Sequence, residues 1–304
     1  MVLARRGVML ALTSAVLAVF GLSGCTPLAT KQATTTTAYV AAQPPPPTDL
    51  GLNVTTVMDA ALPAALNAYI DAKGGHSGVD VVDRVTGATV AVNASRTFQT
   101  ASIVKFDILA TRLYQTQQAG TGLTSHEQAE AKLMITQSDN DAASYLYSRD
   151  GQASGVTAAN KVFGVTNTVP GADGAWGKTR TSPSDQVKLL AAVFKTGGVL
   201  SASNQQYMLS LMSKIESDQA WGITAAKTSA STGVYVKNGW VEMDAYGHLE
   251  GDNSIGRIVE PGHDWLIATM SNYNQTDTAG EKILEALASM AVEGLRLSTQ
   301  HVSV

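Results

Sequence analysis

A serine and a lysine stand three residues apart, at Ser102 and Lys105, where a run with helical spacing begins. Side chains three residues apart on a helix share one face, so the two groups would meet. A serine hydroxyl is a poor nucleophile until a neighbouring base takes its proton. A lysine amine can serve as that base when burial and nearby positive charge lower its pKa. The pair predicts nucleophilic catalysis; the alternative is a helix start followed by a surface lysine.

Two further polar motifs follow. Ser-Asp-Asn occupies residues 138–140, where Ser138 with Asp141 three residues later also resembles the capping box of a helix. Lys237-Asn238-Gly239 lies in an apolar, β-branched run. Asn-Gly is the favoured two-residue hairpin turn, but apolar and aromatic residues continue through Trp240. We therefore expect Lys237 on a strand, where its ammonium could lie beside the nucleophile.

The order S-x-x-K, S-D-N and K-x-G resembles the signature of the penicillin-recognising serine acyl enzymes, and of class A β-lactamases in particular. The resemblance covers nearly all of residues 52–297. It implies that Ser102 is the nucleophile, that Lys105 is its base, and that Ser138 relays a proton to the leaving nitrogen. It also implies an oxyanion hole made by the N–H groups of Ser102 and Trp240. The substrate-binding residues that it implies are Asn140, Lys237, Asn238, Gly239 and Trp240.

The chain departs from the family pattern at two places. Asn238 stands where the family has Thr or Ser, so a hydroxyl that could bind a substrate carboxylate is replaced by an amide. Residues 165–182 correspond to the omega loop, which carries the deacylating Glu of class A enzymes, and they contain no Glu. The only acid there is Asp173, whose side chain is one methylene shorter and which could replace the Glu if the loop brought it near. Because it precedes a glycine, we interpret it as part of a turn. We expect Ser102 to be acylated and the acyl-enzyme to be hydrolysed slowly, since general-base catalysis contributes about 10²–10⁴-fold.

Other candidate sites have weaker support. A literal Lys-Thr-Gly at residues 195–197 follows a helical run, and we interpret it as a helix C-terminus. Arg257, on a late predicted strand, is a candidate source of positive charge for a substrate carboxylate. The five histidines are scattered among predicted loops and ends, and no metal-binding or cofactor-binding motif occurs. We expect neither a metal nor a cofactor.

Hydrophobic periodicity predicts an α+β fold in which one antiparallel sheet is flanked by terminal helices and joined to an all-helical lobe. Ser182 and Pro183 are the expected N-cap and first residue of one helix. Helices are predicted at residues 55–72, 102–117, 126–137, 138–151, 185–194 and 277–297, and strands at residues 79–82, 88–92, 234–241, 253–259 and 265–270.

The first 25 residues are predicted to be a lipoprotein signal peptide. Arg5 and Arg6 precede an apolar run too short to span a membrane stably, and residues 22–25, Leu-Ser-Gly-Cys, match a lipobox. Cys25 is the only cysteine and the expected lipidation site, so one chain holds no disulfide. Residues 26–50 are rich in Thr and Pro and would form a disordered tether. Residues 51–304 would then be a single β-lactamase-like serine hydrolase domain, lipid-anchored to the outer face of a bacterial cell membrane.

Three functions are compatible with these features. The first is a serine hydrolase resembling class A β-lactamases that acts on β-lactams or related amides. The second is a D,D-peptidase or penicillin-binding protein acting on peptidoglycan stem peptides, and the third is a non-catalytic lipoprotein that binds a cell-wall ligand. The formal charge of −4 argues against a nucleic-acid partner. We expect a monomer.

Overall fold

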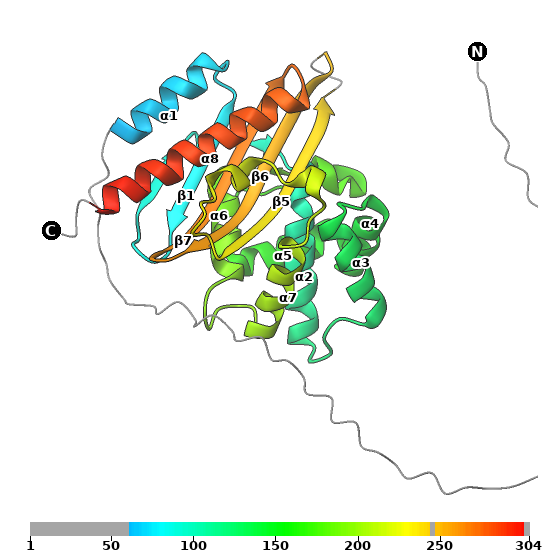
Figure 1. Ribbon diagram of the computed structural model, residues 1–304. Helices are drawn as coiled ribbons and strands as arrows, with labels where there is room; N and C mark the ends of the chain where they lie inside the picture. The colour runs from blue at the N-terminus through cyan, green and yellow to red at the C-terminus, as the bar shows by residue number, and fades with distance from the viewer. Residues whose placement is uncertain (1–60, 244–246, 301–304) are drawn as a thin grey trace, which may run out of the picture. The chain divides into compact units, whose positions relative to one another are not determined.

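The computed structural model describes residues 61–243 and 247–300, which contain both helices and strands (Figure 1). The α-helices are α1 (Ala61–Ala72), α2 (Val104–Gln118), α3 (Ser125–Thr136), α4 (Asn140–Arg149), α5 (Gln152–Phe163), α6 (Pro183–Val193), α7 (Ala202–Met212) and α8 (Asp277–Gln300). The strands are β1 (Ser77–Asp83), β2 (Thr89–Val92), β3 (Phe98–Gln99), β4 (Arg180–Thr181), β5 (Gly233–Met243), β6 (Leu249–Glu260) and β7 (His263–Asn274).

Five of these strands form one antiparallel sheet in the order β2-β1-β7-β6-β5. The N-terminal hairpin joins the C-terminal strands through β1 and β7, where Val81 lies opposite Ile267. β5 is an edge strand, paired only with β6 within this sheet. A separate two-stranded ribbon of β3 and β4 pairs Phe98 with Thr181. The predicted α+β fold with one antiparallel sheet is confirmed.

The two faces of the sheet belong to two apolar cores, because side chains alternate along each strand. On β7, Leu266 and Ala268 belong to the core shared with the helical lobe, whereas Trp265 and Ile267 belong to the core under α1 and α8. Figure 1 shows α8 running across the sheet with α1 beside it, and α2–α5 and α7 grouped as a lobe. The same alternation decides which side chains of β5 can reach the lobe.

The helical lobe is built around α2. Five apolar side chains in and just before it are buried, namely Ile103, Phe106, Ile108, Leu109 and Leu113. A 3₁₀ turn, η1 (Ala101–Ile103), precedes the helix. Two helices, α5 and α7, were not among the predicted elements. Both carry glycine, serine or asparagine within weakly patterned segments, so the hydrophobic period alone does not mark them.

The helix caps confirm one prediction and correct another. Ser182 is the N-cap of α6, where its hydroxyl accepts a hydrogen bond from the backbone N–H of Asp185, and Pro183 is the first helical residue. The capping-box hypothesis for Ser138 is wrong. The carboxylate of Asp139 caps α4 instead, by accepting from the N–H of Ala142, and Ser138 precedes the cap with a φ of 57°. Ser138 is therefore free of a capping role.

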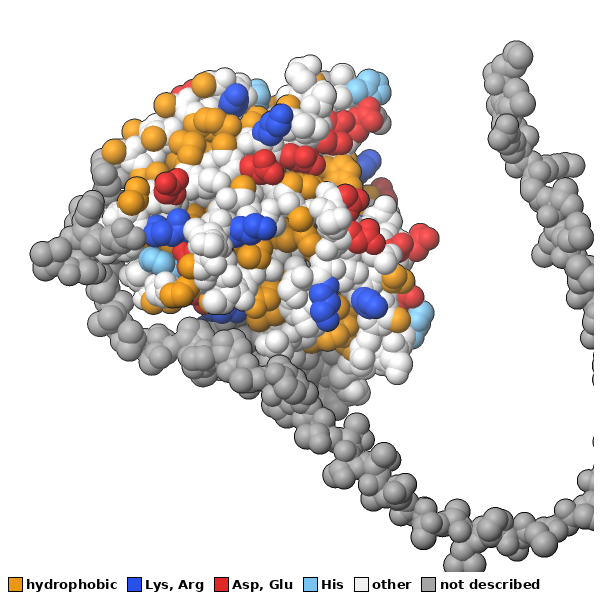
Figure 2. Space-filling model, viewed as in Figure 1, with side chains coloured by type: hydrophobic (Ala, Val, Ile, Leu, Met, Phe, Trp, Pro, Cys, Tyr) orange, Lys and Arg blue, Asp and Glu red, His pale blue; other side chains and the backbone are white. Residues whose placement is uncertain are grey.

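The predicted signal peptide, the tether and Cys25 lie outside the described residues, as do residues 55–60 of the first predicted helix. Among the helices that the structure describes, none is both long enough and apolar enough to span a membrane. Figure 2 shows basic side chains scattered over the visible face of the folded part rather than gathered into one patch.

Candidate active site

The nucleophile candidate Ser102 lies in the short turn η1, between strand β3 and helix α2. Ala101, directly before it, has a φ of 46°, a left-handed conformation that a residue with a Cβ rarely adopts. The backbone around it is held by two neighbouring segments: the N–H of Thr100 donates to the carbonyl of Thr179, and the amide of Asn253 donates to the carbonyl of Gln99. Strain held in this way by surrounding structure is typical of functional sites.

Lys105 is one turn along the same helix face and is fully buried. Its Nζ lies 2.8 Å from the Oγ of Ser102, as the three-residue spacing predicted. The same nitrogen donates to the carbonyl oxygen of Ser138 at 2.6 Å and to the Oδ1 of Asn140 at 2.8 Å. Because the oxygen of the Asn140 amide faces Lys105, its NH₂ group stays available as a donor.

The pKa of Lys105 is lowered to about 8 by burial, which disfavours the charged form, while the charge of Asp139 acts in the opposite direction. With a pKa of about 8, roughly a tenth of the molecules carry a neutral amine at pH 7, far more than for an ordinary lysine. Its amine can then take the proton of the Ser102 hydroxyl, and the distance of 2.8 Å allows that transfer directly.

Ser138 connects the nucleophile pair to the third motif. Its Oγ lies 3.1 Å from the Nζ of Lys105 and 3.0 Å from the Nζ of Lys237, which reaches it from strand β5. Lys237 is completely buried and also donates to the carbonyl of Asn238. Burial, followed by the positive charge of Lys105, holds the pKa of Lys237 well below its usual range. The hydroxyl of Ser138 is thus bonded to two amines, which suits a group that relays a proton.

The third motif runs through the middle of β5 and is not a hairpin turn. Gly239 lies against the start of helix α2: a Cβ placed on it would lie 2.6 Å from the backbone nitrogen of Ser102. Only glycine fits this close approach between the strand and the nucleophile. The backbone that follows it, at Trp240, is therefore carried on the same strand past Ser102.

Asn238 and Trp240 place their side chains on the other face of β5. Val236, two residues before Asn238, belongs to the core under α8, so alternation assigns the even-numbered side chains to that face. The amide nitrogen of Asn238 donates to the carbonyls of Gln219 and Trp221. The indole of Trp240 is 43% exposed and makes an edge contact with Trp221. The predicted binding of substrate by the side chain of Asn238 is not what this geometry favours.

The loop of residues 165–182 supplies a residue that motif reasoning missed. Trp176, in the short turn η3 (Trp176–Lys178), lies with its ring centroid 5.0 Å from the Nζ of Lys105. Its indole N–H donates to the Oγ of Ser144 on α4 at 3.1 Å. Asp173, the only acid of this stretch, is exposed and sits in a turn with a φ of 53°. The one available signal was an aromatic residue inside a loop otherwise rich in Gly and Ala.

Two other candidates lie away from these residues. The Lys-Thr-Gly at residues 195–197 follows the end of α6 at Val193, in agreement with its interpretation as a helix C-terminus. Arg257 is bonded through two of its nitrogens to both carboxylate oxygens of Asp264, at 2.7 and 3.0 Å, and its guanidinium lies over the ring of Phe194. The hypothesis that Arg257 presents its charge to a substrate carboxylate is therefore wrong. The residues that the structure describes contain no group of three or more metal-ligating side chains able to hold an ion.

Comparison with known proteins agrees with this geometry. The model of the Beta-lactamase enzyme family matches residues 61–130 and 115–295 of the chain. The chain therefore belongs to the Beta-lactamase enzyme family, and its fold is that of the class A β-lactamases.

Solved structures of this fold cover most of the chain. PBP-A superposes with a TM-score of 0.68 at 19% identity, over 78% of this chain and 97% of that protein. The TLA-1 extended-spectrum β-lactamase gives a TM-score of 0.68 at 18% identity, over 77% and 98%. A β-lactamase from Chitinophaga pinensis gives 0.66 at 16% identity, over 77% and 98%. At these identities the likeness shows the fold.

A curated relative is similar over a shorter stretch. The putative lipoprotein LppW of Mycobacterium tuberculosis is 30% identical over 117 residues, which is 38% of this chain. The matched stretch spans 37% of the length of LppW, little more than a third.

Proposed function

We propose that the protein is a serine acyl enzyme that β-lactams or related amides acylate at Ser102, and that it releases the acyl group slowly. The observation that carries the proposal is the 2.8 Å contact between the Oγ of Ser102 and the Nζ of Lys105, an amine whose pKa is lowered to about 8. Nucleophile and base are both present in reacting geometry, without a change of conformation.

The acylation step follows from these contacts. The Oγ of Ser102 attacks the carbonyl carbon of the amide while its proton passes to the neutral amine of Lys105. The negative charge that develops on the carbonyl oxygen would be stabilised by the N–H groups of Ser102 and Trp240; loss of one such donor costs about 10²–10³ in rate. As the C–N bond breaks, the hydroxyl of Ser138 gives its proton to the leaving nitrogen and is replenished from the lysines bonded to it.

Slow deacylation is supported by the composition and position of the loop at residues 165–182. Hydrolysis of the ester needs a base that activates water, and the loop brings an indole, not a carboxylate, to Lys105. Asp173 is directed to solvent in a turn of its own. The acyl-enzyme would accumulate because acylation has both its nucleophile and its base, whereas hydrolysis of the ester lacks a base.

A second function, a D,D-peptidase or penicillin-binding protein acting on peptidoglycan stem peptides, is favoured by the same lack of an acid in residues 165–182. PBP-A is among the structures with this fold, and a leucine-to-glutamate variant of PBP-A has been solved as its acyl-enzyme complex with penicillin G. A third candidate is a non-catalytic lipoprotein that binds a cell-wall ligand. The name of LppW and the lipobox at Cys25 support a lipid-anchored protein on the outer face of a bacterial cell membrane.

The proposal is tested by an intact-mass time course of the purified protein mixed with benzylpenicillin, with Ser102→Ala in parallel. We expect an adduct on the wild type that persists, and none on Ser102→Ala. An adduct that appears and clears quickly would mean efficient deacylation. Absence of any adduct would contradict acylation by β-lactams. Rates on nitrocefin and on a D-Ala-D-Ala peptide then separate the hydrolase from the peptidase, whereas a pure binder would keep its affinity in Ser102→Ala.

A further inference from the structure

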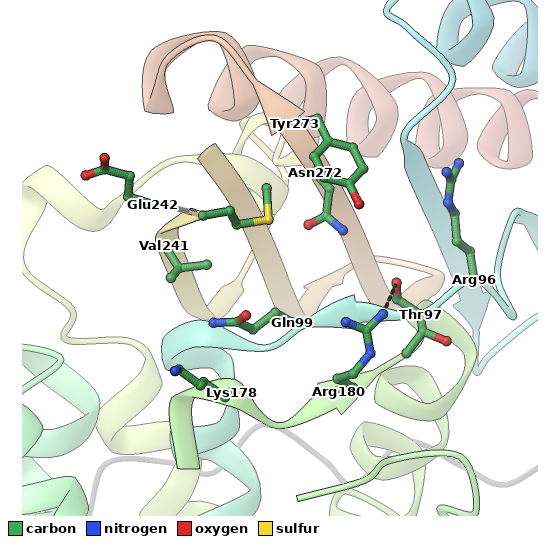
Figure 3. A pocket seen from close by; sticks show the side chains of 10 residues that line it. Arg96, Thr97, Gln99, Lys178, Arg180, Val241, Glu242, Asn272 and Tyr273 are labelled. Atoms are coloured by element: carbon green, nitrogen blue, oxygen red, sulfur yellow. Dashed lines mark hydrogen bonds between the residues drawn. The ribbon is translucent and has the colours of Figure 1, made fainter. Parts of the chain in front are cut away.

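A groove of about 630 Å³ lies next to the candidate active site and takes no part in the steps described above. Figure 3 shows side chains from the ribbon of β3 and β4, from the end of β5 and from the end of β7 around it. Gln99 in its wall is three residues before Ser102, and Lys178 in its wall is two residues after Trp176. The groove therefore adjoins both the nucleophile turn and the loop that covers Lys105.

The order of contacts along β5 shows on which side of Ser102 the groove lies. Lys237 contacts Ser138, the proton relay to the leaving group, and Gly239 packs against the nitrogen of Ser102. Val241 and Met243, on the same face of the strand, line the groove. Leaving group, nucleophile and groove follow one another along the strand. The groove is thus on the acyl side, roughly 7–14 Å beyond Gly239 at about 3.4 Å per residue.

The groove is positively charged in a chain whose net charge is −4. Its lining includes Arg96, Lys178 and Arg180 against one acid, Glu242. Glu242 is on the alternate face of β5, is paired with His248, and points away from the other labelled side chains in Figure 3. The guanidinium of Arg180 turns toward the centre of the groove, where one nitrogen donates to the carbonyl of Thr97 at 3.4 Å.

Two of these cations are available to a ligand. Neither Lys178 nor Arg180 forms an ion pair with any acid in residues 61–243 or 247–300. Arg96 is engaged with the carbonyl of Gly75 and with the ring of His76. A guanidinium with free N–H groups is suited to a carboxylate, which accepts charge-assisted hydrogen bonds from it. Lys178 lies apart from Arg180 on the same wall of the groove and adds a second positive charge there (Figure 3).

We propose that this groove is a binding site for a carboxylate carried on the acyl portion of the substrate, held by Arg180 and Lys178 while Ser102 is acylated. The proposal rests on the acyl-enzyme function proposed above. Such a site would favour substrates with an extended acyl chain that carries a carboxylate. The carboxylate would have to lie as far from the reacting carbonyl as the groove lies from Ser102 along β5. The group stays in the groove after the leaving amine departs, because it belongs to the half that remains esterified.

A matched pair of penicillins tests the proposal. Both carry a hexanedioyl side chain on the same nucleus, and they differ only in having a terminal carboxylate or the neutral primary amide. By intact mass, we expect the wild type to be acylated roughly fivefold to twentyfold faster by the acid than by the amide at low salt. Sodium chloride should reduce this preference, since the groove is open to solvent. Equal rates for the two compounds would overturn the proposal while leaving the acyl enzyme intact.

Variants assign the effect to the groove. Arg180→Gln and Lys178→Gln should each reduce the preference for the acid, and the double variant should abolish it. Lys195→Gln, which removes an exposed lysine beyond the end of α6, is the matched control and should keep the preference. A preference that survives in the double variant would place the carboxylate elsewhere.

Equilibrium binding to Ser102→Ala separates this inference from the proposed function, since no ester can form there. We expect calorimetry to give a lower Kd for the acid than for the amide, by a similar factor, and equal values once Arg180→Gln and Lys178→Gln are both added. Tighter binding of the acid, combined with no adduct on the wild type, would disprove acylation but support the groove as a carboxylate-binding site. Equal Kd values for acid and amide in Ser102→Ala would disprove the groove whatever Ser102 does.

Discussion

The two halves of the candidate active site are built to different degrees. On one side, Ser102, Lys105, Ser138 and Lys237 form a continuous set of contacts between 2.8 and 3.1 Å, drawn from a helix, a loop and a strand. On the other side, residues 165–182 offer Lys105 only the ring of Trp176. Within one fold, the groups that we propose for attack on an amide contact one another, whereas the loop at residues 165–182 brings an aromatic ring and no carboxylate to Lys105.

The difference teaches that the two steps of an acyl enzyme depend on separate parts of the chain. The groups that we propose for attack lie on the helical lobe and the edge strand, which pack through two buried cores. Hydrolysis needs one more group from a surface loop. A loop of this kind accepts changes of sequence more readily than the cores do. One fold can therefore keep acylation and lose turnover.

The largest effect on the acylation rate is expected at Lys105, the proposed base. Replacing Lys105 by methionine keeps an unbranched side chain one atom shorter but removes the base, so acylation by benzylpenicillin should slow by about 10²–10⁴-fold. The rate of adduct formation by intact mass is the measurement. Lys132→Met, at an exposed position on α3, is the control and should leave the rate unchanged. Acylation of Lys105→Met at the rate of the wild type would show that another group deprotonates Ser102.

A carboxylate introduced in the loop of residues 165–182 should speed deacylation. Trp176→Glu would place an acid near Lys105, and we expect the acyl-enzyme to clear about 10²-fold faster, at the lower end of the range for general-base catalysis. Loss of the adduct over time after removal of excess penicillin is the measurement.

Trp176→Gln is the control for this change, because it removes the ring without adding a charge. If Gln and Glu speed deacylation equally, exclusion of water by the indole, and not the lack of a base, limits hydrolysis. If neither speeds it, the position of Trp176 is irrelevant to turnover and the comparison between the two sides fails.

The acylation rate should depend on pH through Lys105. Lys105 acts as a base only when neutral, and its pKa is lowered to about 8. The acylation rate should therefore rise about tenfold per pH unit below pH 8 and level off above it. Stopped acylation reactions measured by mass between pH 6 and pH 9 would show this. A rate that falls as pH rises through 8 would mean that Lys105 must be protonated to act.

The smallest effect on reactivity is expected at Asn238, although it lies inside a motif. Asn238→Ser restores the hydroxyl typical of the family but leaves the buried carbonyls of Gln219 and Trp221 without donors. We expect the free energy of unfolding to fall by about 1–3 kcal/mol, measured in urea, while the acylation rate changes only a few-fold. Loss of acylation as severe as in Lys105→Met would show that the amide of Asn238 serves the substrate directly.

Much of the fold could be predicted from local patterns. Alternating apolar residues marked β1, β5, β6 and β7, and the Ser182-Pro183 pair marked the start of α6. Neighbouring residues report these features because periodicity and capping depend on contacts a few positions apart in the chain. The same reasoning left Ser138 open between a capping box and a role in the site, since both share one pattern and only the backbone at Asp139 separates them.

The sequence by itself determined the contact between Ser102 and Lys105, because a spacing of three residues on a helix fixes it. It also determined the order of the three motifs and the lack of a glutamate in residues 165–182. Only the tertiary structure decided that Lys237 reaches Ser138 across 99 residues, that Trp176 covers Lys105, and that a basic groove continues from Ser102. These contacts join segments whose distance depends on sheet order and on how the lobe packs against it, and no local pattern encodes that distance.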